Sequence, residues 1–272
     1  MLLSNRKKQR LWYTVILMVC VIGFWLFENF YTPAPYTDSK ASTNESEMPA
    51  EMVPTSTTNE VVHHQFFSLS YHETYEQAEW VAYTLKKEHL TYDDRRRPYF
   101  IEDPKVKSKS ADWRNYKGSG YDRGHLCPAG DRRFSEFAYN ETFYTSNISP
   151  QDNDFNAGIW NRLEQKTRYW AKAYGTLYVI TGGVLEKGLF TIGEEDVAIP
   201  KQYYKIVVRG KGDHIKIAAF LMPHQEDTAP LSQFLVSVDT IERLTGIDFF
   251  SELPDREEAL LEKQVTPREW KF

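Results

Sequence analysis

The sequence contains little cysteine and has no excess of positive charge. Only Cys20 and Cys127 occur among 272 residues, which excludes a disulfide-stapled scaffold and a cysteine-rich zinc site. We expect both to be free thiols. The 33 lysines and arginines are outnumbered by 38 aspartates and glutamates, so the net charge is −5. This charge disfavours a protein that coats nucleic acid or anionic membrane with its whole surface.

The sequence also lacks the composition of a disordered, collagen-like or low-complexity protein. Hydrophobic residues make up 41% of the chain and aromatic residues 15%, so most of it is expected to fold around a core. A chain of this length fits one sizeable domain with appendages. Because the composition does not change again after residue 61, we predict a single folded domain over residues 61–272.

The first thirty residues predict a membrane-associated helix. A basic segment, residues 1–10, precedes an apolar run from Leu11 to Phe27. A helix of this length reaches about 26 Å, at the low end for a bilayer core of roughly 30 Å. We favour an uncleaved anchor over a cleaved secretory signal, because no A-x-A-like cleavage site follows. Both alternatives export the domain, and the positive charge keeps residues 1–10 of an anchor in the cytoplasm.

The segment that follows is polar. From Thr32 to Glu60 the chain is dominated by Thr, Ser, Pro, Glu and Asn, with Tyr36 as its single aromatic residue. Such a composition buries too little apolar surface to offset the entropy lost on ordering. We therefore predict a flexible linker over residues 28–60.

The remaining sequence mixes helical and strand patterns. Apolar residues at 78, 81, 82 and 85 recur at helical spacing and predict a helix near 74–88. Runs rich in β-branched and aromatic residues predict strands at 176–181, 203–209 and 215–222, and periodicity predicts helices at 237–244 and 257–263. The expected fold class is α+β, with a central, mostly antiparallel or mixed sheet flanked by helices.

Positive charge is concentrated in one part of the chain. Residues 95–133 contain eleven lysines and arginines and five aspartates and glutamates, a local charge of 11 − 5 = +6. A solvated basic surface and a site for a polyanion both explain this concentration. Aromatic residues in the same stretch, at 99, 113, 116 and 121, belong either to the core or to a surface that stacks on sugars and bases.

A cluster of chemically useful residues begins inside this basic stretch. The sequence Asp122-Arg123-Gly124-His125 is followed by residues 156, 160, 164 and 168, an asparagine, a tryptophan, a glutamate and an arginine. Their spacing of four places them on one face of a predicted helix at 154–174. A polar ridge of this kind is either an exposed helix face or a cleft wall, in which an amide oxygen and a carboxylate hold a hydrated hard cation.

The segments DRGHLCP, SNISPQ and NAGIWNRLEQKTR, in this order and spacing, resemble the DNA/RNA non-specific endonuclease family. The similarity runs from about residue 71 to the C-terminus. The resemblance implies a central sheet flanked by helices, with a beta-beta-alpha metal motif (His-Me finger) that sets the histidine on a strand facing a metal-binding helix. It also implies a metal-dependent nuclease.

The resemblance assigns roles to the central residues of the motif. His125 matches the general base, and Asn156 matches the direct protein ligand of the metal. Glu164 matches the acidic residue that orients metal-bound water. Arg123 and Arg168 match arginines that lie beside the phosphate, and the resemblance gives each of them both a catalytic and a substrate-binding role.

Further residues are assigned less directly. Asn147 matches an active-site asparagine that orients either the histidine or the substrate. Arg97 corresponds to another substrate-binding arginine, and Asp122 is expected to fix the loop. Cys127 stands where the family more often has a small residue, and we assign it no role.

These residue types suit phosphodiester hydrolysis. A neutral imidazole accepts a proton from water near neutral pH, and one neutral side-chain ligand leaves a cation most of its waters, which suits Mg²⁺. We therefore predict an exported, membrane-tethered endonuclease that cuts DNA and/or RNA with Mg²⁺, or alternatively Mn²⁺, as cofactor. Two alternatives are a non-catalytic surface protein that captures nucleic acid with the same fold, and a phosphodiesterase acting on smaller esters.

Overall fold

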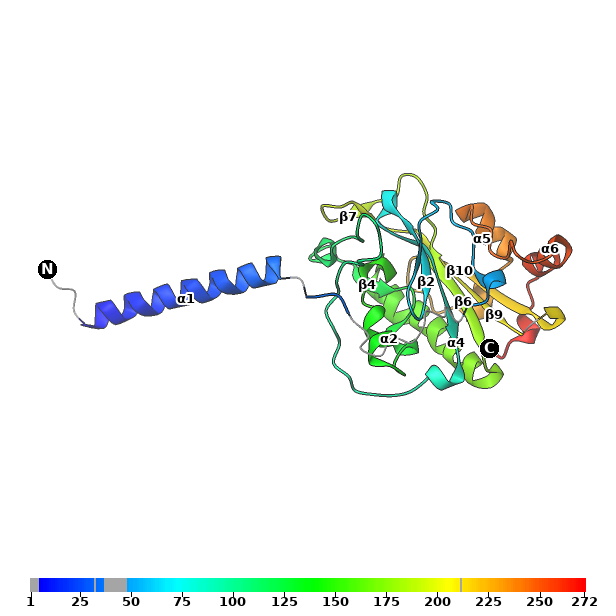
Figure 1. The fold of residues 1–272 in the computed structure, drawn as a ribbon, viewed down its shortest axis with the longest axis horizontal. Coiled ribbons are helices and arrows are strands. Elements are labelled where there is room, and N and C mark those ends of the chain that lie inside the picture. Colours follow the sequence, from blue (N-terminus) through cyan, green and yellow to red (C-terminus); the bar gives the residue numbers. More distant parts are fainter. Residues whose placement is uncertain (1–4, 32, 37–47, 211) are drawn as a thin grey trace. The chain divides into compact units, whose positions relative to one another are not determined.

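The computed structural model describes residues 5–31, 33–36, 48–210 and 212–272, with the side chains of residues 5 and 213 left aside. The described chain forms two compact units, Met1–Ala34 and Pro35–Phe272, which we consider separately. Figure 1 shows the helix of the first unit and the folded second unit. The first four residues and residues 37–47 of the predicted linker lie outside the described part.

The first unit consists of one long helix, α1 (Asn5–Phe30). Within its segment Arg6–Phe30, an 18-residue stretch has a mean hydropathy of 2.0 and none of it is buried within the structure. The apolar side chains from Leu11 to Phe27 are therefore exposed. By length and composition this helix can cross a membrane, which agrees with the expected apolar segment.

The second unit is built on a seven-stranded sheet in which every pair of neighbours is antiparallel. Along the sheet the order is β1 (Val61–His63), β2 (Ser68–His72), β3 (Gln77–Leu85), β6 (Leu177–Gly183), β9 (Gln202–Arg209), β10 (Lys216–Pro223) and β11 (Leu235–Val236). Three of these confirm the predicted strands at 176–181, 203–209 and 215–222. The expected α+β class is confirmed.

The predicted helix at 74–88 is wrong, because residues 77–85 of this segment form the interior strand β3. All nine residues of β3 are buried, so the apolar pattern has no polar face to reveal a period of two. The helical spacing of Ala78, Val81, Ala82 and Leu85 arises from a strand packed on both faces. The aromatic residues Trp80 and Tyr83 favour strands and were the evidence in the sequence against a helix.

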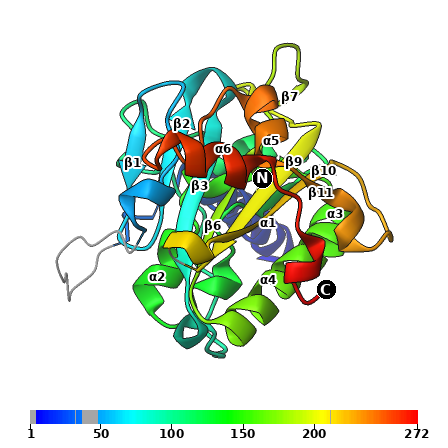
Figure 2. The ribbon, with the colours of Figure 1, turned by 90° about the vertical axis from the view of Figure 1, so that its right-hand side faces the viewer.

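Helices cover both faces of the sheet (Figure 2). On one face, α4 (Asn161–Tyr174) contributes Leu163 and Trp170 to a core cluster that also contains Val81 and Val207 of the sheet. On the other face, α5 (Val238–Thr245) and α6 (Asp255–Lys263) pack with core residues such as Trp80. The two C-terminal helices confirm the predictions at 237–244 and 257–263. Two layers of apolar contacts thus hold the sheet in the centre of the unit.

Smaller elements complete the unit. A second hairpin pairs β4 (Asp122–His125) with β5 (Ile148–Gln151), and α2 (Glu136–Glu141) lies between these strands in the sequence. A third short hairpin joins β7 (Thr191–Ile192) and β8 (Val197–Ala198). The hairpin of β4 and β5 is followed at once by α3 (Asn153–Phe155), a π-helical turn at Asn156–Trp160, and α4.

Residues 48–60 differ from the flexible linker expected over 28–60. Met48 and Met52 are buried in the core beneath α5. Thr55 donates its backbone N–H to Asp248 O at 2.8 Å, and the Thr57 N–H donates to Glu79 Oε1 at 2.9 Å. Two methionines and a few backbone hydrogen bonds thus order a segment whose overall composition is polar. The packed part of the chain begins before Val61.

Candidate active site

The β4–β5 hairpin presents the Asp-Arg-Gly-His motif on a short strand. In its register Asp122 faces Gln151, and Gly124 faces Ser149. A Cβ atom at Gly124 would lie 2.2 Å from the Gln151 side chain, so a larger residue at this position would have to displace that side chain. The Gln151 side chain is fully buried, and neither atom of its amide group has a hydrogen-bond partner in the described part of the chain.

His125 ends β4 and is surrounded by aromatic rings and positive charge. Its ring lies edge-on to Phe143 at a centroid distance of 4.8 Å, and Phe100 lies at 5.6 Å. Burial, together with the charges of Arg97 and Arg123, lowers the pKa of His125 to about 3. The imidazole is therefore neutral at physiological pH. Its Nε2 atom is buried and has no partner among the described residues.

Two predicted phosphate-binding arginines stand beside this histidine. The guanidinium of Arg97 lies 4.9 Å from the centroid of Phe100, and that of Arg123 lies 4.7 Å from the same centroid. Arg123 also lies 5.6 Å from the ring of Trp113. Phe100 thus supports both arginines through cation–π contacts, and both positive charges lie close to the neutral imidazole.

Asn156 is oriented by the same strand that carries His125. Its Nδ2 donates to Asp122 Oδ2 at 2.9 Å, and the neighbouring Asn153 donates to the same oxygen at 3.1 Å. Because the amide nitrogen is held by Asp122, the amide oxygen of Asn156 is directed away from that carboxylate. This oxygen is the kind of hard, neutral ligand that Mg²⁺ accepts.

The polar ridge expected on one regular helix is interrupted by the π-helical turn. Gly158 departs from helical geometry (φ −93°, ψ −108°), and Glu226 Oε2 accepts the Ile159 N–H at 3.1 Å inside this turn. A Cβ atom at Gly158 would lie 1.8 Å from Glu226 Oε2. The wide turn rotates Trp160 into the core, where it is fully buried. Trp160 therefore does not share the polar face that we predicted for it.

Glu164 and Arg168 remain together on α4. Arg168 Nη2 lies 3.2 Å from Glu164 Oε2, and Arg168 Nε donates to the buried Asp131 at 2.6 Å. Burial raises the pKa of Glu164 even though Arg168 lies beside it. Burial lowers the pKa of Arg168, but Asp131 and Glu164 outweigh this effect and raise it. Arg168 thus remains charged and fixed in place.

A buried lysine completes this charged group. Lys205 lies in the middle of β9, is fully buried and has no hydrogen-bond partner for Nζ in the described structure. Its ammonium lies 4.8 Å from the ring centroid of Trp160. Burial lowers its pKa, and the negative charges of Glu164 and Asp131 oppose this change. Lys205 thus lies within electrostatic range of the carboxylates of Glu164 and Asp131.

Asn147 acts on the backbone that follows His125. Its Oδ1 accepts the Cys127 N–H at 2.7 Å, and its Nδ2 donates to Cys127 O at 3.0 Å and to Thr142 O at 2.9 Å. Asn147 is fully buried. These contacts hold the backbone two residues after His125, and whether Asn147 orients the histidine or the substrate stays a prediction.

The two cysteines, His224 and part of the basic stretch lie outside the proposed chemistry. The free thiol Cys127 is buried, and burial raises its pKa to about 12, while the free thiol Cys20 is exposed. His224 accepts the Asp152 N–H at 2.7 Å at the start of α3. Part of the basic stretch is structural, since Arg132 is buried and Arg114 pairs with Asp112 at 2.6 Å.

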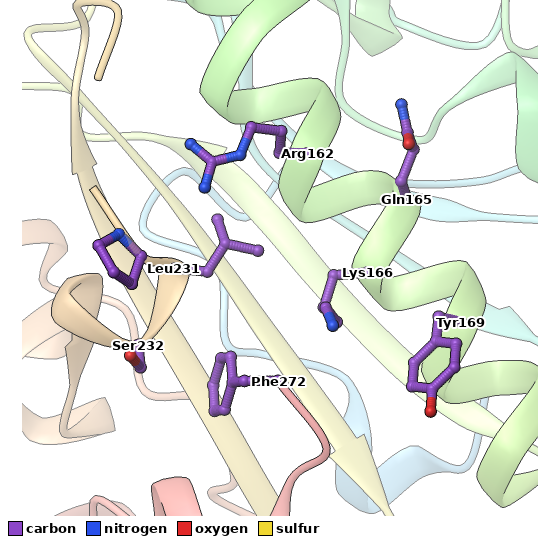
Figure 3. A pocket seen from close by; sticks show the side chains of 8 residues that line it. Arg162, Gln165, Lys166, Tyr169, Leu231, Ser232 and Phe272 are labelled. Carbon is purple, nitrogen blue, oxygen red and sulfur yellow. The ribbon is translucent and has the colours of Figure 1, made fainter. Parts of the chain in front are cut away.

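A separate surface pocket lies on another face of α4. It is lined by Arg162, Lys166 and Tyr169 of α4 together with Leu231 and Phe272, as Figure 3 shows. None of its lining residues belongs to the predicted site. Arg162 donates to the carbonyl oxygens of residues 227 and 229 at 3.2 and 3.1 Å, so its guanidinium is already engaged.

Sequence reasoning missed four residues around the site. These are Phe100, Asp131, Gln151 and Lys205. A lysine inside the apolar run YYKIVV was a signal for Lys205, because an unpaired charge is costly inside a buried strand. Gln151 was visible within the SNISPQ segment, but the sequence did not show that its amide is buried.

The geometry and the sequence together define the class of the protein. The profile of the DNA/RNA non-specific endonuclease family matches residues 44–256. The chain belongs to this family, and the resemblance recognised from the motifs is confirmed.

Individual relatives are similar over most of the second unit. The chain is 36% identical to mitochondrial endonuclease G of Homo sapiens (62% of this chain, 62% of the relative) and 34% identical to mitochondrial nuclease EXOG of Mus musculus (68% and 55%). Nuclease C1 of Cunninghamella echinulata is 33% identical (72% and 85%). The alignment thus spans less than two thirds of the length of the two mitochondrial relatives.

A solved structure also shares the fold. It is a crystal structure of the EndoG/EndoGI complex, whose title concerns the mechanism of EndoG inhibition. One chain of it matches with a TM-score of 0.67 and 32% identity, covering 73% of this chain and 88% of that chain.

Proposed function

We propose that this chain is a metal-dependent endonuclease that hydrolyses phosphodiester bonds in DNA and/or RNA with little sequence preference. The observation that carries the proposal is the neutral imidazole of His125, which lies close to the charges of Arg97 and Arg123 on the strand that orients Asn156. Membership of a nuclease family and the nuclease relatives support the same activity.

The residues of the site divide the chemistry among them. The imidazole of His125 accepts the proton of the attacking water, since it is neutral at physiological pH. Arg97 and Arg123 attract and hold the phosphate of the substrate. These arginines would contact the phosphate backbone of the nucleic acid and not its bases, so we expect little sequence preference.

The donor set fits a hydrated divalent cation. The Asn156 amide oxygen is the one direct ligand we propose, and Glu164 would hold a water of the ion. A zinc site is built from a group of carboxylate, imidazole or thiolate side chains. In the described chain, neither Asn156 nor Glu164 belongs to a group of three such side chains. Mg²⁺ fits best, and Mn²⁺ is the alternative. Bound there, the cation would stabilise negative charge on the phosphate and on the departing 3′ oxygen.

We further propose that α1 tethers the nuclease to a membrane, with the domain on the extracytoplasmic side. The basic residues before Leu11 and the apolar run from Leu11 to Phe27 within α1 support this proposal. Protease added to intact cells should degrade the nuclease domain while its N-terminal sequence remains intact. A mature chain that begins after residue 30 would instead show secretion after cleavage of a signal.

A supercoiled plasmid tests the proposed activity most simply. With Mg²⁺ the full chain should convert the plasmid to nicked and linear forms, and EDTA should stop this conversion. The His125→Ala variant serves as the matched control for contaminating nucleases. Binding of the plasmid without cleavage would favour the capture protein, and cleavage of bis-p-nitrophenyl phosphate alone would favour the smaller esters.

A further inference from the structure

Five carboxylates gather where α5 meets α6, across the sheet from α4. They are Asp239, Glu242, Asp248, Glu258 and Glu262, from α5, the loop after it and α6. The oxygens of Asp239, Glu242 and Glu262 lie within 4.8 Å of one another, and so do those of Asp248, Glu258 and Glu262. Glu262 belongs to both groups and is therefore the centre of the cluster.

Glu262 is an unusual member of such a cluster because it is buried. Only 7% of its surface is exposed, and its Oε1 has no hydrogen-bond partner within the described residues. A buried carboxylate oxygen without a partner is costly, since it has lost its water and gained nothing in return. Glu262 contributes an oxygen to both groups of the cluster. Burial and the neighbouring Glu242 and Glu258 raise the pKa of Glu262 to about 8, so its negative charge is unfavourable there without a cation.

The cluster also lacks a balancing positive charge. Among the described residues, none of the five carboxylates forms an ion pair with a lysine, arginine or histidine. Carboxylates at these separations repel one another, and the repulsion is strongest where water is excluded. A cation that binds between them would remove the repulsion and satisfy the orphaned oxygen of Glu262.

We propose that this cluster binds one calcium ion, which clamps α6 onto α5. Calcium takes six to eight oxygen ligands at about 2.3 to 2.6 Å, so two oxygens on opposite sides of the ion lie about 4.8 Å apart. The spacing in both groups meets this limit. Calcium fits better than Mg²⁺, which keeps several waters and demands near-octahedral geometry.

The backbone around the cluster is fixed before any ion binds. The helix α5 ends at Gly246, whose φ of +73° turns the chain, and Glu242 Oε1 accepts the Phe249 N–H at 3.1 Å. The Thr55 hydroxyl accepts the Asp248 N–H at 2.9 Å. By contrast, α6 contributes only the partly buried Leu261 to the core on this face. An ion bound by both helices would therefore provide the main attachment of α6 to α5.

Thermal unfolding of the full chain in detergent tests the proposal. After treatment with EGTA, Ca²⁺ is added at a fixed excess of Mg²⁺, and Tm is followed by tryptophan fluorescence. Saturating Ca²⁺ should raise Tm by about 4 °C or more. Equilibrium dialysis with radioactive Ca²⁺ should show one ion bound per chain.

Two variants assign the effect to the cluster. Glu262→Gln keeps the shape of the side chain and should abolish both the Ca²⁺-dependent rise in Tm and the bound ion. Glu257→Gln, on the exposed side of α6 and outside the cluster, should retain both. If Glu262→Gln does not fold, the exposed Asp248→Asn should weaken Ca²⁺ binding at least about tenfold. An unchanged Tm of the wild-type chain with Ca²⁺, or undiminished Ca²⁺ binding by the first of these variants that folds, would overturn the proposal.

Discussion

Two histidines of the folded unit occupy opposite electrostatic environments. His125 lies beside Arg97 and Arg123, and its Nε2 has no partner within the described chain. His64 is buried between two carboxylates, with Nε2 2.7 Å from Asp103 Oδ2 and Nδ1 3.4 Å from Glu141 Oε1. Burial lowers the pKa of His64, but the two carboxylates outweigh it and raise the pKa above its ordinary value.

The difference shows how the same side chain becomes a base in one place and a structural cation in another. Positive neighbours keep His125 neutral and able to accept a proton, at the edge of a basic surface. Negative neighbours favour the protonated form of His64, which is enclosed between two buried carboxylates. Activity should therefore depend on His125 and stability on His64.

The largest expected effect is on turnover. His125→Ala should lower kcat by about 10²- to 10⁴-fold, because removal of a general base commonly costs that much, and it should leave nucleic-acid affinity nearly unchanged. Plasmid cleavage under saturating substrate and a binding assay in EDTA measure the two quantities. His64→Ala is the matched control and should retain its rate per folded molecule.

The second expected effect is on folding. His64→Ala leaves the buried carboxylates of Asp103 and Glu141 without their cation, which should lower the free energy of unfolding by about 3 kcal/mol. Urea unfolding followed by fluorescence measures this loss. An equal loss of stability in His125→Ala would contradict the claim that His64 serves stability and His125 serves activity.

The third expected effect distinguishes Asn156, the proposed metal ligand, from the neighbouring Asn153, which is not a proposed ligand. Asn156→Ala should lower activity by about 10- to 100-fold and raise the Mg²⁺ concentration needed for half-maximal activity. Asn153→Ala removes a similar hydrogen bond to the same Asp122 oxygen and should change the Mg²⁺ titration little. An identical titration for wild type and Asn156→Ala would rule out ligation by this residue.

The smallest expected effect is on the pH dependence of stability. The raised pKa of His64 means that its contribution is present below about pH 6.5 and is lost as the pH rises through the folded-state pKa. For His125 the contribution is present above about pH 6.5 and is lost as the pH falls toward about 3. Plots of Tm against pH should therefore lose their alkaline decline in His64→Gln and part of their acid decline in His125→Gln.

Three strands and two helices of the fold were predicted from the sequence, but the strand β3 was not, because burial on both faces removes the alternation by which strands are recognised. His125 and Asn156 were singled out by the resemblance of their motifs to the family, and their roles as base and metal ligand stay predictions. The π-helical turn depends on the contact between Gly158 and Glu226, which lie far apart in the sequence. The supporting roles of Lys205 and Gln151 likewise arise from burial.

Chemical rescue tests the role of His125 most directly. Cleavage of plasmid by His125→Ala should be slow and should accelerate as neutral imidazole is added, whereas Asn156→Ala should not respond to imidazole. A His125→Ala variant that retains more than about a tenth of the wild-type rate without imidazole would contradict the assignment of His125 as the general base.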